Sequence, residues 1–374
     1  MKVSTAVLER SGASLPFADS RPIRIIKTEL GKPRRDEVLF KIAAAGVCHS
    51  DLAAITGKRP RPLPVALGHE ASAIVVEVGD GVTNLEKGDH VVMSFLPTCG
   101  ECPMCATGRA SLCEPGYKAN AAGTLLSGHK PFSINGQSLN HHSGVSAFTE
   151  YTVVSKHSVV KIDQDVDLVH AALFGCAVMT GVGVVMNTCK VRPGESVAII
   201  GLGGVGMAAV LGAVASGASK IIAVDLKESK LEAAKNMGAT HCYLADDADV
   251  VSLVRDAAGD GVDYAIELAG VHQAFDLAYK VTKRGGVTST AGLSSSKSNF
   301  EVSPLSLVGE ERVIKGSYMG SCIPSRDIPR YIELFKLGKL PVDKLLSSTG
   351  PLSDINKAFD NLVNGDVIRH VIIP

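Results

Sequence analysis

The chain has 374 residues, of which 45% are hydrophobic, and its 38 basic and 38 acidic side chains give a formal net charge of zero. This length exceeds the usual size of a single hydrophobic core, so we expect two domains. The charge balance argues against nucleic-acid binding and favours a small-molecule partner. The N-terminus lacks the apolar core of a signal peptide, so we expect a cytoplasmic protein that does not engage a membrane.

The first part of the chain predicts short strands punctuated by prolines and glycines, the clearest of them at 37–45. This pattern favours an irregular antiparallel barrel over repeated strand and helix units. We predict one domain over residues 1–178. Polar segments interrupt its strands at Gly46-Val47-Cys48-His49-Ser50-Asp51 and at Gly68-His69-Glu70.

A tight cluster of cysteines follows, with the spacing C-x2-C-x2-C-x7-C. Four thiolates at these intervals, with Gly and Pro between them, can fold a loop around one tetrahedral Zn²⁺. An iron–sulfur cluster is the alternative, but its bacterial spacing differs and ends in Cys-Pro, whereas Glu114 follows the last cysteine here. Four thiolates leave no position for water, so we predict a closed, structural zinc site in a lobe over 95–115. Its ligands are Cys99, Cys102, Cys105 and Cys113.

Residues 114–147 form a long connection that contains the pair His141-His142. Without other ligand types nearby, we interpret this pair as part of a solvated loop. Strand character returns at 151–155, and a segment containing Cys176 leads into a helix that crosses to the second domain.

Residues 196–225 predict a buried strand, a glycine turn, a helix and a second strand that ends at Asp225. The turn has the pattern G-x-G-x-x-G. Gly201 permits the tight turn, Gly203 lets the backbone approach a pyrophosphate, and Gly206 lets the helix press on the strand. The helix N-terminus offers unpaired N–H groups to phosphates, and the carboxylate of Asp225 can accept hydrogen bonds from a ribose.

The same carboxylate predicts which cofactor binds. It would repel a 2′-phosphate, so we predict NAD rather than NADP. Lys227 and Lys230 lie close by and could soften that repulsion, but we expect them to reach the ribose or solvent.

A membrane span is the alternative for residues 196–218, which carry no charge and are long enough to cross a bilayer. The glycines would make a poor spanning helix, no basic flank marks a cytoplasmic side, and a further strand follows at once. We therefore favour the dinucleotide site.

Beyond the glycine turn, strands and helices alternate to about residue 320, which predicts a doubly wound parallel sheet over 179–320. Gly292-Leu293 follow a strand end and would lie near the nicotinamide. Residues 321–374 return to short elements, with two helices and a last strand at 369–373, and we assign them to the first domain. The predicted fold class is α/β.

Cys48, His69 and Cys176 remain once the four-cysteine set is removed. Two thiolates and an imidazole are a ligand set for Zn²⁺ that leaves a fourth position open. Three unconnected buried core residues are the alternative. Cys189, Cys242 and Cys322 match no ligand spacing and are expected to be buried thiols.

These segments, in their order and spacing, resemble the zinc-containing medium-chain alcohol dehydrogenases over essentially the whole chain. The resemblance implies a GroES-like catalytic domain, a Rossmann NAD-binding domain and two Zn²⁺ per chain, with the catalytic zinc on Cys48, His69 and Cys176. It implies reversible hydride transfer from a zinc-bound alkoxide to NAD, which gives an aldehyde or ketone. Matching cofactor positions are Gly201, Gly203, Gly204, Val205, Gly206, Asp225, Lys230, Gly292 and Leu293.

The resemblance also implies roles around the zinc. Asp51 would orient the imidazole of His69, with Glu70 as a second carboxylate behind the ligands. Ser50 would pass the hydroxyl proton toward the cofactor ribose, but Ala53 stands where many members place a histidine, so the proton exit route stays open. The remaining matches are His49 and Arg369 at the pyrophosphate and Phe95 in the alcohol channel.

Several alternatives stay open. Glutathione-dependent formaldehyde dehydrogenases are the nearest other branch, but Tyr117 replaces an arginine of that branch and Arg59 stands where it has acidic residues. A non-enzymatic alternative is an NAD-sensing zinc-ribbon protein. The basic run 58–62 is either a solvated loop or an attractor for acidic alcohols. The loop after Cys113 resembles that of the homodimeric branch more than that of the homotetrameric forms.

Overall fold

The computed structural model describes residues 1–295 and 298–374, which divide into two compact units. The first unit contains residues 1–176, 323–333 and 346–374, and the second contains 177–322 and 334–345. The sequence predicts that all of 321–374 belongs to the first domain, whereas 334–345 lies in the second unit. The 3₁₀ helix η6 (Val342–Leu345) packs on helix α7 (Gly204–Ala215) of the second unit, because its side chains Val342 and Leu345 are fully buried.

The first unit is built from two antiparallel-rich sheets, as expected for a GroES-like barrel domain. In the larger sheet the long strand β3 (Glu37–Gly46) pairs antiparallel with β5 (Ala71–Val78) and β10 (Tyr151–Ser155). Its strand order is β11-β6-β5-β3-β19-β18, and the other sheet has the order β8-β7-β2-β1-β4-β9. The remaining strands are β1 (Lys2–Leu8), β2 (Ile23–Leu30), β4 (Val65–Ala66), β6 (His90–Met93), β7 (Phe132–Ile134), β8 (Gln137–Ser138), β9 (Asn140–His141), β11 (Val159–Ile162) and β18 (Leu346–Pro351).

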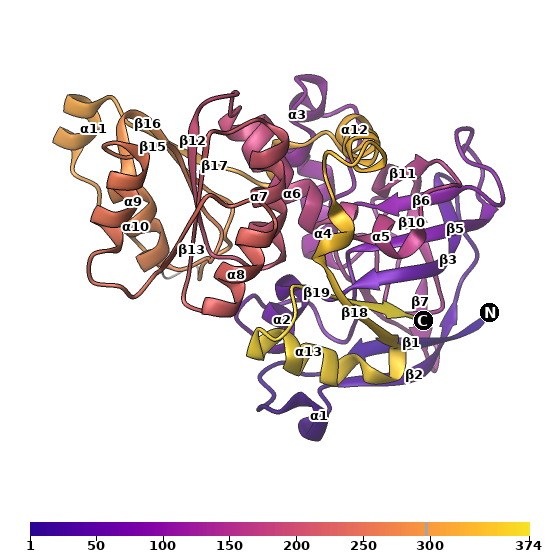
Figure 1. Ribbon diagram of the computed structural model, residues 1–374. Coiled ribbons are helices and arrows are strands. Elements are labelled where there is room, and N and C mark those ends of the chain that lie inside the picture. The colour runs from indigo at the N-terminus through magenta and orange to yellow at the C-terminus, as the bar shows by residue number, and fades with distance from the viewer. Residues whose placement is uncertain (296–297) are drawn as a thin grey trace. The chain divides into compact units, whose positions relative to one another are not determined.

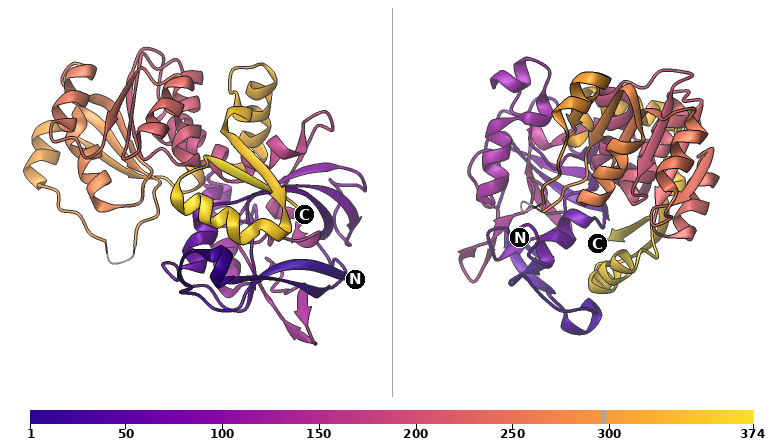
Figure 2. Two further views of the ribbon diagram at one scale, coloured as in Figure 1. Left: turned by 60° about the horizontal axis from the view of Figure 1, so that its bottom comes forward. Right: turned by 90° about the vertical axis from the view of Figure 1, so that its left-hand side faces the viewer.

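The C-terminal segment completes this first unit. Strand β19 (Arg369–Ile373) pairs antiparallel with the end of β3, with Val371 opposite Gly46. Helix α13 (Ile355–Asn364) packs beside the N-terminal elements, because Asp360 accepts hydrogen bonds from the amides of Phe17 and Ala18 (Figure 2). The pairing of β19 with β3 places Arg369 close to the chain that leaves β3. Short helices of this unit are α1 (Phe17–Ser20), α2 (His49–Ile55), α3 (Pro103–Ala106), α4 (Glu114–Ala122) and α5 (Leu168–Ala172), and α12 (Pro324–Lys336) runs from it into the second unit.

The second unit is a six-stranded parallel sheet with the order β14-β13-β12-β15-β16-β17, which is the order of a dinucleotide-binding Rossmann domain. Helices α7 and α8 (Glu228–Asn236) cover one face, and α9 (Val250–Ala258) and α10 (His272–Val281) cover the other (Figure 1). The doubly wound sheet predicted from the sequence is confirmed. Its other elements are α6 (Ala177–Gly183), β12 (Ser196–Ile200), β13 (Lys220–Asp225), β14 (His241–Leu244), β15 (Val262–Glu267), β16 (Thr282–Thr290), α11 (Pro304–Glu310) and β17 (Val313–Gly316).

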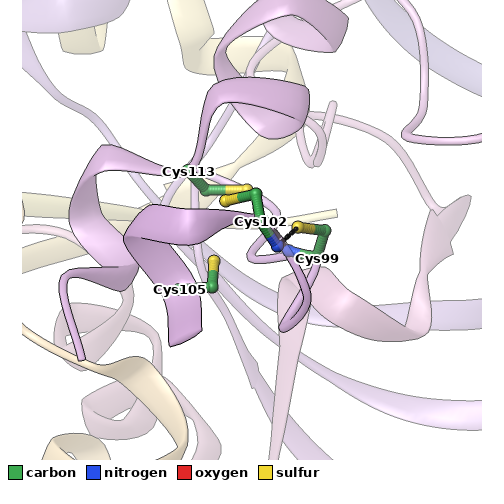
Figure 3. Close-up of side chains that lie close together, drawn as sticks. All are labelled: Cys99, Cys102, Cys105 and Cys113. Atoms are coloured by element: carbon green, nitrogen blue, oxygen red, sulfur yellow. Dashed lines mark hydrogen bonds between the residues drawn. The ribbon is translucent and has the colours of Figure 1, made fainter. Parts of the chain in front are cut away.

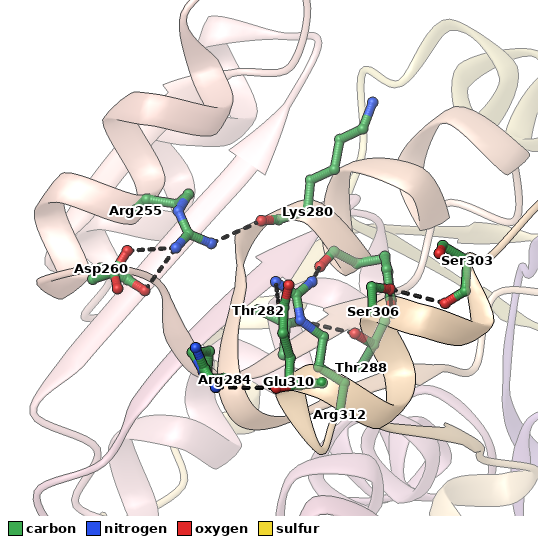
Figure 4. Close-up of polar contacts among 12 residues, drawn as sticks. Arg255, Asp260, Lys280, Thr282, Arg284, Thr288, Ser303, Ser306, Glu310 and Arg312 are labelled. Atoms are coloured by element: carbon green, nitrogen blue, oxygen red, sulfur yellow. Dashed lines mark hydrogen bonds and ion pairs between the residues drawn. The ribbon is translucent and has the colours of Figure 1, made fainter.

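Two arginines hold the outer helices of the second unit in place. Arg255 of α9 donates to the carbonyl oxygens of Lys280 and Asp260, each at 3.1 Å (Figure 4). Arg312 donates to the carbonyl of Tyr279 and lies over that ring, 4.8 Å from its centroid. The contacts with Tyr279 and Lys280 satisfy carbonyls at the C-terminal end of α10, which have no partner within the helix.

Residues 196–218, the candidate membrane span, form a strand, a turn and helix α7. No single helix in the described part of the chain is both long and apolar enough to cross a bilayer, although the bent pair at 168–175 and 177–189 passes on length and composition.

Candidate active site and metal centres

The four clustered cysteines converge on one point. Their sulfur atoms all lie within 4.8 Å of one another (Figure 3). Helix α3 begins directly after Cys102, and α4 directly after Cys113. Backbone amides donate to the sulfurs, from Cys102 to Cys99 and from Cys99 to Cys113, both at 3.3 Å. The amide of Cys105 lowers the pKa of Cys102 to about 6. Burial raises the pKa of Cys105 to about 12 and also raises the pKa of Cys113, so these two sulfurs would give up protons to a metal. The all-sulfur donor set fits a closed tetrahedral zinc.

A second cluster lies in the same unit and is fully buried. Ligand atoms of Cys48, His69, Glu70 and Cys176 also lie within 4.8 Å of one another. Cys48 is the residue before helix α2, and it follows strand β3 after a single intervening residue. His69 and Glu70 come immediately before β5, and Cys176 follows the 3₁₀ turn η3 (Leu173–Gly175). The structure thus brings together the three ligands predicted from the sequence, with a carboxylate added.

The backbone conformation at position 68 explains why a glycine precedes His69. Its backbone has φ +97, which side chains of L-residues rarely adopt, and a Cβ atom there would lie 2.5 Å from the amide nitrogen of Phe148. The same conformation points the Gly68 amide at Asp51, whose Oδ1 accepts a hydrogen bond at 3.1 Å. A glycine is therefore required one residue before the imidazole.

Asp51 is the centre of the contacts behind the ligands. It lies in the first turn of α2, and its side chain has no solvent exposure. Its Oδ2 lies 2.9 Å from Nδ1 of His69, and its Oδ1 lies 3.1 Å from Nδ1 of His142. Burial opposes ionisation of this carboxyl, but His69 and His142 outweigh it and lower its pKa below the usual range. An ionised Asp51 holds the imidazole of His69 with Nε2 directed away from it.

The expectation of a solvated loop at His141-His142 is wrong, because both side chains are buried, with 2% and 1% exposure. Burial lowers the pKa of His141 to about 3, and its ring lies 6.0 Å from that of Phe132. The ring of His142 meets His69 edge-on, with centroids 5.6 Å apart. His142 is thus a site residue that the sequence reasoning missed. The signal was available, since HHSGVSAFT at 141–149 contains no Asp, Glu, Lys or Arg, which favours burial over a solvated loop.

Charge in the buried cluster is strongly coupled. A hydrogen bond from Cys176 lowers the pKa of Cys48, with help from the positive charges of His69 and Arg369, while the same bond raises the pKa of Cys176. Burial alone would lower the pKa of His69, but Asp51 and Cys48 raise it to about 10.

Two further charged groups complete the cluster. Burial raises the pKa of Glu70 to about 7, although Arg369 acts against this. The guanidinium of Arg369 is 1% exposed, lies 3.6 Å from Oε1 of Glu70 and donates to the carbonyl of Val47 at 3.4 Å.

A divalent metal ion fits this second cluster on two grounds. Nε2 of His69 and both carboxylate oxygens of Glu70 are buried with no hydrogen-bond partner among the described residues, a costly arrangement that a metal would relieve. In addition, Asp51 raises the pKa of His69 against the effect of burial, and Cys48 raises that of Cys176, so the cluster favours added positive charge, which a divalent cation would supply in place of protons. Two sulfurs and one nitrogen favour zinc among such metals.

The glycine turn of the second unit has the expected geometry. Gly201 has φ +94, and a Cβ on Gly206 would lie 2.0 Å from the carbonyl oxygen of Gly201, so only glycine permits this approach of helix to strand. Gly204 and Val205 are the first residues of α7.

The carboxylate at the end of β13 is already engaged with this turn. Asp225 accepts a hydrogen bond from the amide of Leu202 at 2.7 Å, and Nζ of Lys230 lies 3.7 Å from the same carboxylate oxygen. Gly292 donates its amide to the carbonyl of Glu267 at 3.2 Å, and Leu293 next to it is exposed.

The other predicted residues lie around the buried cluster. His49, the first residue of α2, is exposed, and Ser50 beside it is half-buried. The hydroxyl of Ser50 accepts a hydrogen bond from Arg59 at 3.2 Å. The ring of Phe95 meets His69 edge-on, with centroids 5.9 Å apart. Of the cysteines expected to be buried thiols, Cys189 and Cys322 are buried, whereas Cys242 is only half-buried.

Zinc content tests the two clusters separately. We expect two zinc ions per chain in the wild-type protein and one in either Cys102→Ser or Cys48→Ser, because each change removes one ligand from one cluster. Cys242→Ser is the matched control and should keep both ions. The check is metal analysis by mass spectrometry after gel filtration. Full zinc retention in Cys48→Ser would contradict the second site.

The contact between His142 and Asp51 predicts a second effect on metal binding. His142→Ala removes one partner of the buried carboxylate and loosens the orientation of His69, so zinc at that cluster should bind about 10- to 100-fold more weakly. Competition with a chelator should release one ion early while the four-cysteine site keeps its own. His129→Ala is a matched control, since His129 contacts Glu37 at 2.9 Å and should leave zinc release unchanged. Equal release curves for the wild type and His142→Ala would refute the effect.

Known families match both units. Residues 34–164 match the alcohol dehydrogenase GroES-like domain and 204–336 match the zinc-binding dehydrogenase family. An S-(hydroxymethyl)glutathione dehydrogenase of Synechocystis is 38% identical over 97% of this chain and 99% of its own. A benzyl alcohol dehydrogenase from Acinetobacter calcoaceticus superposes with a TM-score of 0.93 at 32% identity, over 100% of this chain and 99% of its own.

A zinc-binding dehydrogenase structure from Sinorhizobium meliloti, bound to NADP, superposes with a TM-score of 0.81 at 25% identity and covers 100% of both chains. Together with the two clusters and the parallel sheet, these likenesses show that the chain belongs to the zinc-containing medium-chain alcohol dehydrogenase family and is a zinc-dependent alcohol dehydrogenase.

Proposed function

We propose that this dehydrogenase oxidises small primary or secondary alcohols reversibly to aldehydes or ketones, with NAD as the hydride acceptor. The observation that carries the proposal is the buried set Cys48, His69 and Cys176, with Ser50 in the first turn of α2, directly after Cys48 and His49. Cys48, His69 and Cys176 would hold a zinc ion, which would supply Lewis-acid chemistry at an alcohol oxygen.

The side chains around Cys48, His69 and Cys176 have the remaining roles in proton transfer, ligand orientation, charge balance and substrate contact. Ser50 accepts the proton of the substrate hydroxyl and passes it on through its own O–H. Asp51 keeps Nε2 of His69 aimed at the metal position. Glu70 and Arg369 balance charge behind the ligands. Phe95, edge-on to His69, gives the substrate position an apolar wall.

The cofactor assignment rests on Asp225 at the end of β13. A carboxylate at this position accepts the ribose hydroxyls of NAD and repels the 2′-phosphate of NADP. Family membership leaves the choice open, since the relative from Sinorhizobium meliloti is bound to NADP. We further assign Gly201, Gly203, Gly204, Val205 and Gly206 to the pyrophosphate, Lys230 to the ribose, and Gly292 and Leu293 to the nicotinamide.

His49 and Arg369 are proposed as additional pyrophosphate contacts. The exposure of His49 supports this role, because it leaves the ring accessible to a ligand. For Arg369 the support is the family resemblance, since its guanidinium is buried against Glu70.

Glutathione-dependent formaldehyde oxidation is the second candidate, favoured by the 38% identity to S-(hydroxymethyl)glutathione dehydrogenases. Two positions speak against it. Tyr117 is 67% exposed and supplies no cation where that branch has an arginine. Arg59 stands at a position where that branch has acidic residues, and it donates a hydrogen bond to Ser50.

We also propose a cytoplasmic homodimer. Strand β17 is an edge strand of the parallel sheet, and exposed apolar side chains gather there, with Leu305 at 80% and Val308 at 78% exposure in the preceding helix α11. An exposed edge strand with apolar neighbours is a surface that natural proteins cover.

Initial rates of NADH formation test the function on protein of known zinc content. We expect turnover of aliphatic and aromatic alcohols without glutathione, because Tyr117 itself supplies no cation where the glutathione-dependent branch has an arginine. The substrate panel should include formaldehyde with and without glutathione. Turnover only when both formaldehyde and glutathione are present would move the protein to the second candidate.

Replacing Asp225 by Asn tests the cofactor assignment. The amide keeps an acceptor for the Leu202 amide but removes the charge, so the ratio of kcat/KM for NADP to that for NAD should rise at least about tenfold. Steady-state kinetics with both cofactors is the measurement, with Asp256→Asn, an exposed residue of α9, as the control. An unchanged ratio would show that the carboxylate does not select the cofactor.

A further inference from the structure

Arg59 is a cation without a matching anion. It lies just after helix α2 and is half-buried, and one Nη donates to Oγ of Ser50 in the first turn of that helix. No Asp or Glu within the part of the chain that the structure describes forms an ion pair with its guanidinium. A partly desolvated guanidinium with no carboxylate partner has unused donors and a favourable potential for an anion.

Neighbouring groups add to this potential. Arg61 is half-buried two residues further on, and its positive charge assists burial in lowering the pKa of His142. Lys58, before Arg59, is exposed. Arg59 thus adds positive charge at Ser50 through its hydrogen bond, and Arg61 adds positive potential at His142, while the lysine of the same run is exposed.

The hydrogen bond also defines how Ser50 can act. Its oxygen accepts from Arg59, so its own hydrogen is available for a second partner. If the substrate hydroxyl contacts Oγ, a group bound to the guanidinium lies three successive hydrogen bonds of about 3 Å away, and thus within about 9 Å of the reacting oxygen. One unpaired guanidinium suits a singly charged carboxylate, which it can bind through two parallel N–H groups.

We propose that Arg59 forms an anion subsite beside Ser50 and that the preferred substrates are small alcohols carrying a carboxylate. This rests on the proposed function, because it takes Ser50 as the residue next to the reacting hydroxyl. Within the basic run 58–62, Arg59 then binds the substrate, whereas Lys58 belongs to the solvated surface.

Two substrates of similar shape but different charge test the subsite. 3-(Hydroxymethyl)benzoate and 3-(hydroxymethyl)benzamide differ in charge but are similar in size, so their ratio of kcat/KM isolates the anion. The wild-type enzyme should prefer the benzoate. Arg59→Gln should lower the ratio of kcat/KM for the benzoate to that for the benzamide about 10- to 100-fold, the range of a charge-assisted hydrogen bond. Arg59→Lys should keep part of the preference, and Lys58→Gln should keep all of it.

Three outcomes overturn the proposal. The first is an equal loss on both substrates in Arg59→Gln, which would mean that Arg59 acts through Ser50 alone. The second is an unchanged benzoate efficiency. The third is a wild-type ratio that does not fall as salt is raised, which tests the subsite even if a variant fails to fold.

Calorimetric titration of the same benzoate separates failure of the subsite from failure of the proposed function. Binding to zinc-loaded wild type that weakens in Arg59→Gln supports the subsite, even if no alcohol gives NADH. Equal binding to both proteins overturns it, whatever the turnover.

Discussion

A buried carboxylate organises the catalytic half of this protein. Asp51 has no solvent exposure, and an ionised group in such a position is tolerated only when other groups replace the lost water. Here the replacements come from two segments far apart in the chain: Gly68 and His69 in one, and His142 in the other. The helix α2, the turn before β5 and the loop after β9 are thereby tied to one another. The orientation of the metal-binding imidazole is a consequence of this arrangement.

The two cysteine clusters differ in the groups that stabilise their charges. In the lobe around Cys99, backbone amides favour the thiolate form, and four sulfurs enclose a metal completely. In the cluster around Cys48, acidic groups face Arg369 in a dry environment where unbalanced charge is costly. We propose only the two sulfurs and the imidazole as ligands there, with Glu70 beside Arg369, and this set would leave a position for a substrate oxygen. The four cysteines around Cys99 lie close together in the sequence. The residues around Cys48 come from distant segments, which meet once β3 and β5 have paired.

Much of this could be predicted from residues alone. Strong period and turn signals located β19 to the residue and indicated the parallel sheet, because glycine turns and β-branched runs are local features. The three ligands around Cys48 could be proposed only by combining residue chemistry with a family resemblance. What failed depended on tertiary packing. His142 is buried in contact with Asp51, and residues 334–345 belong to the second unit because η6 packs on α7. The hydrogen bond from Arg59 to Ser50 was likewise outside the reach of sequence patterns.

The most direct test of this account is a crystal structure of the zinc-loaded protein with anomalous diffraction recorded at the zinc edge. The account predicts one anomalous peak among the sulfurs of Cys99, Cys102, Cys105 and Cys113 and a second bonded to Cys48, Cys176 and Nε2 of His69. At the second site, Asp51 should still contact Nδ1 of His69 and His142. A zinc-loaded structure with no peak at the second site, or with the metal bound through Nδ1 after the contact with Asp51 has broken, would contradict it.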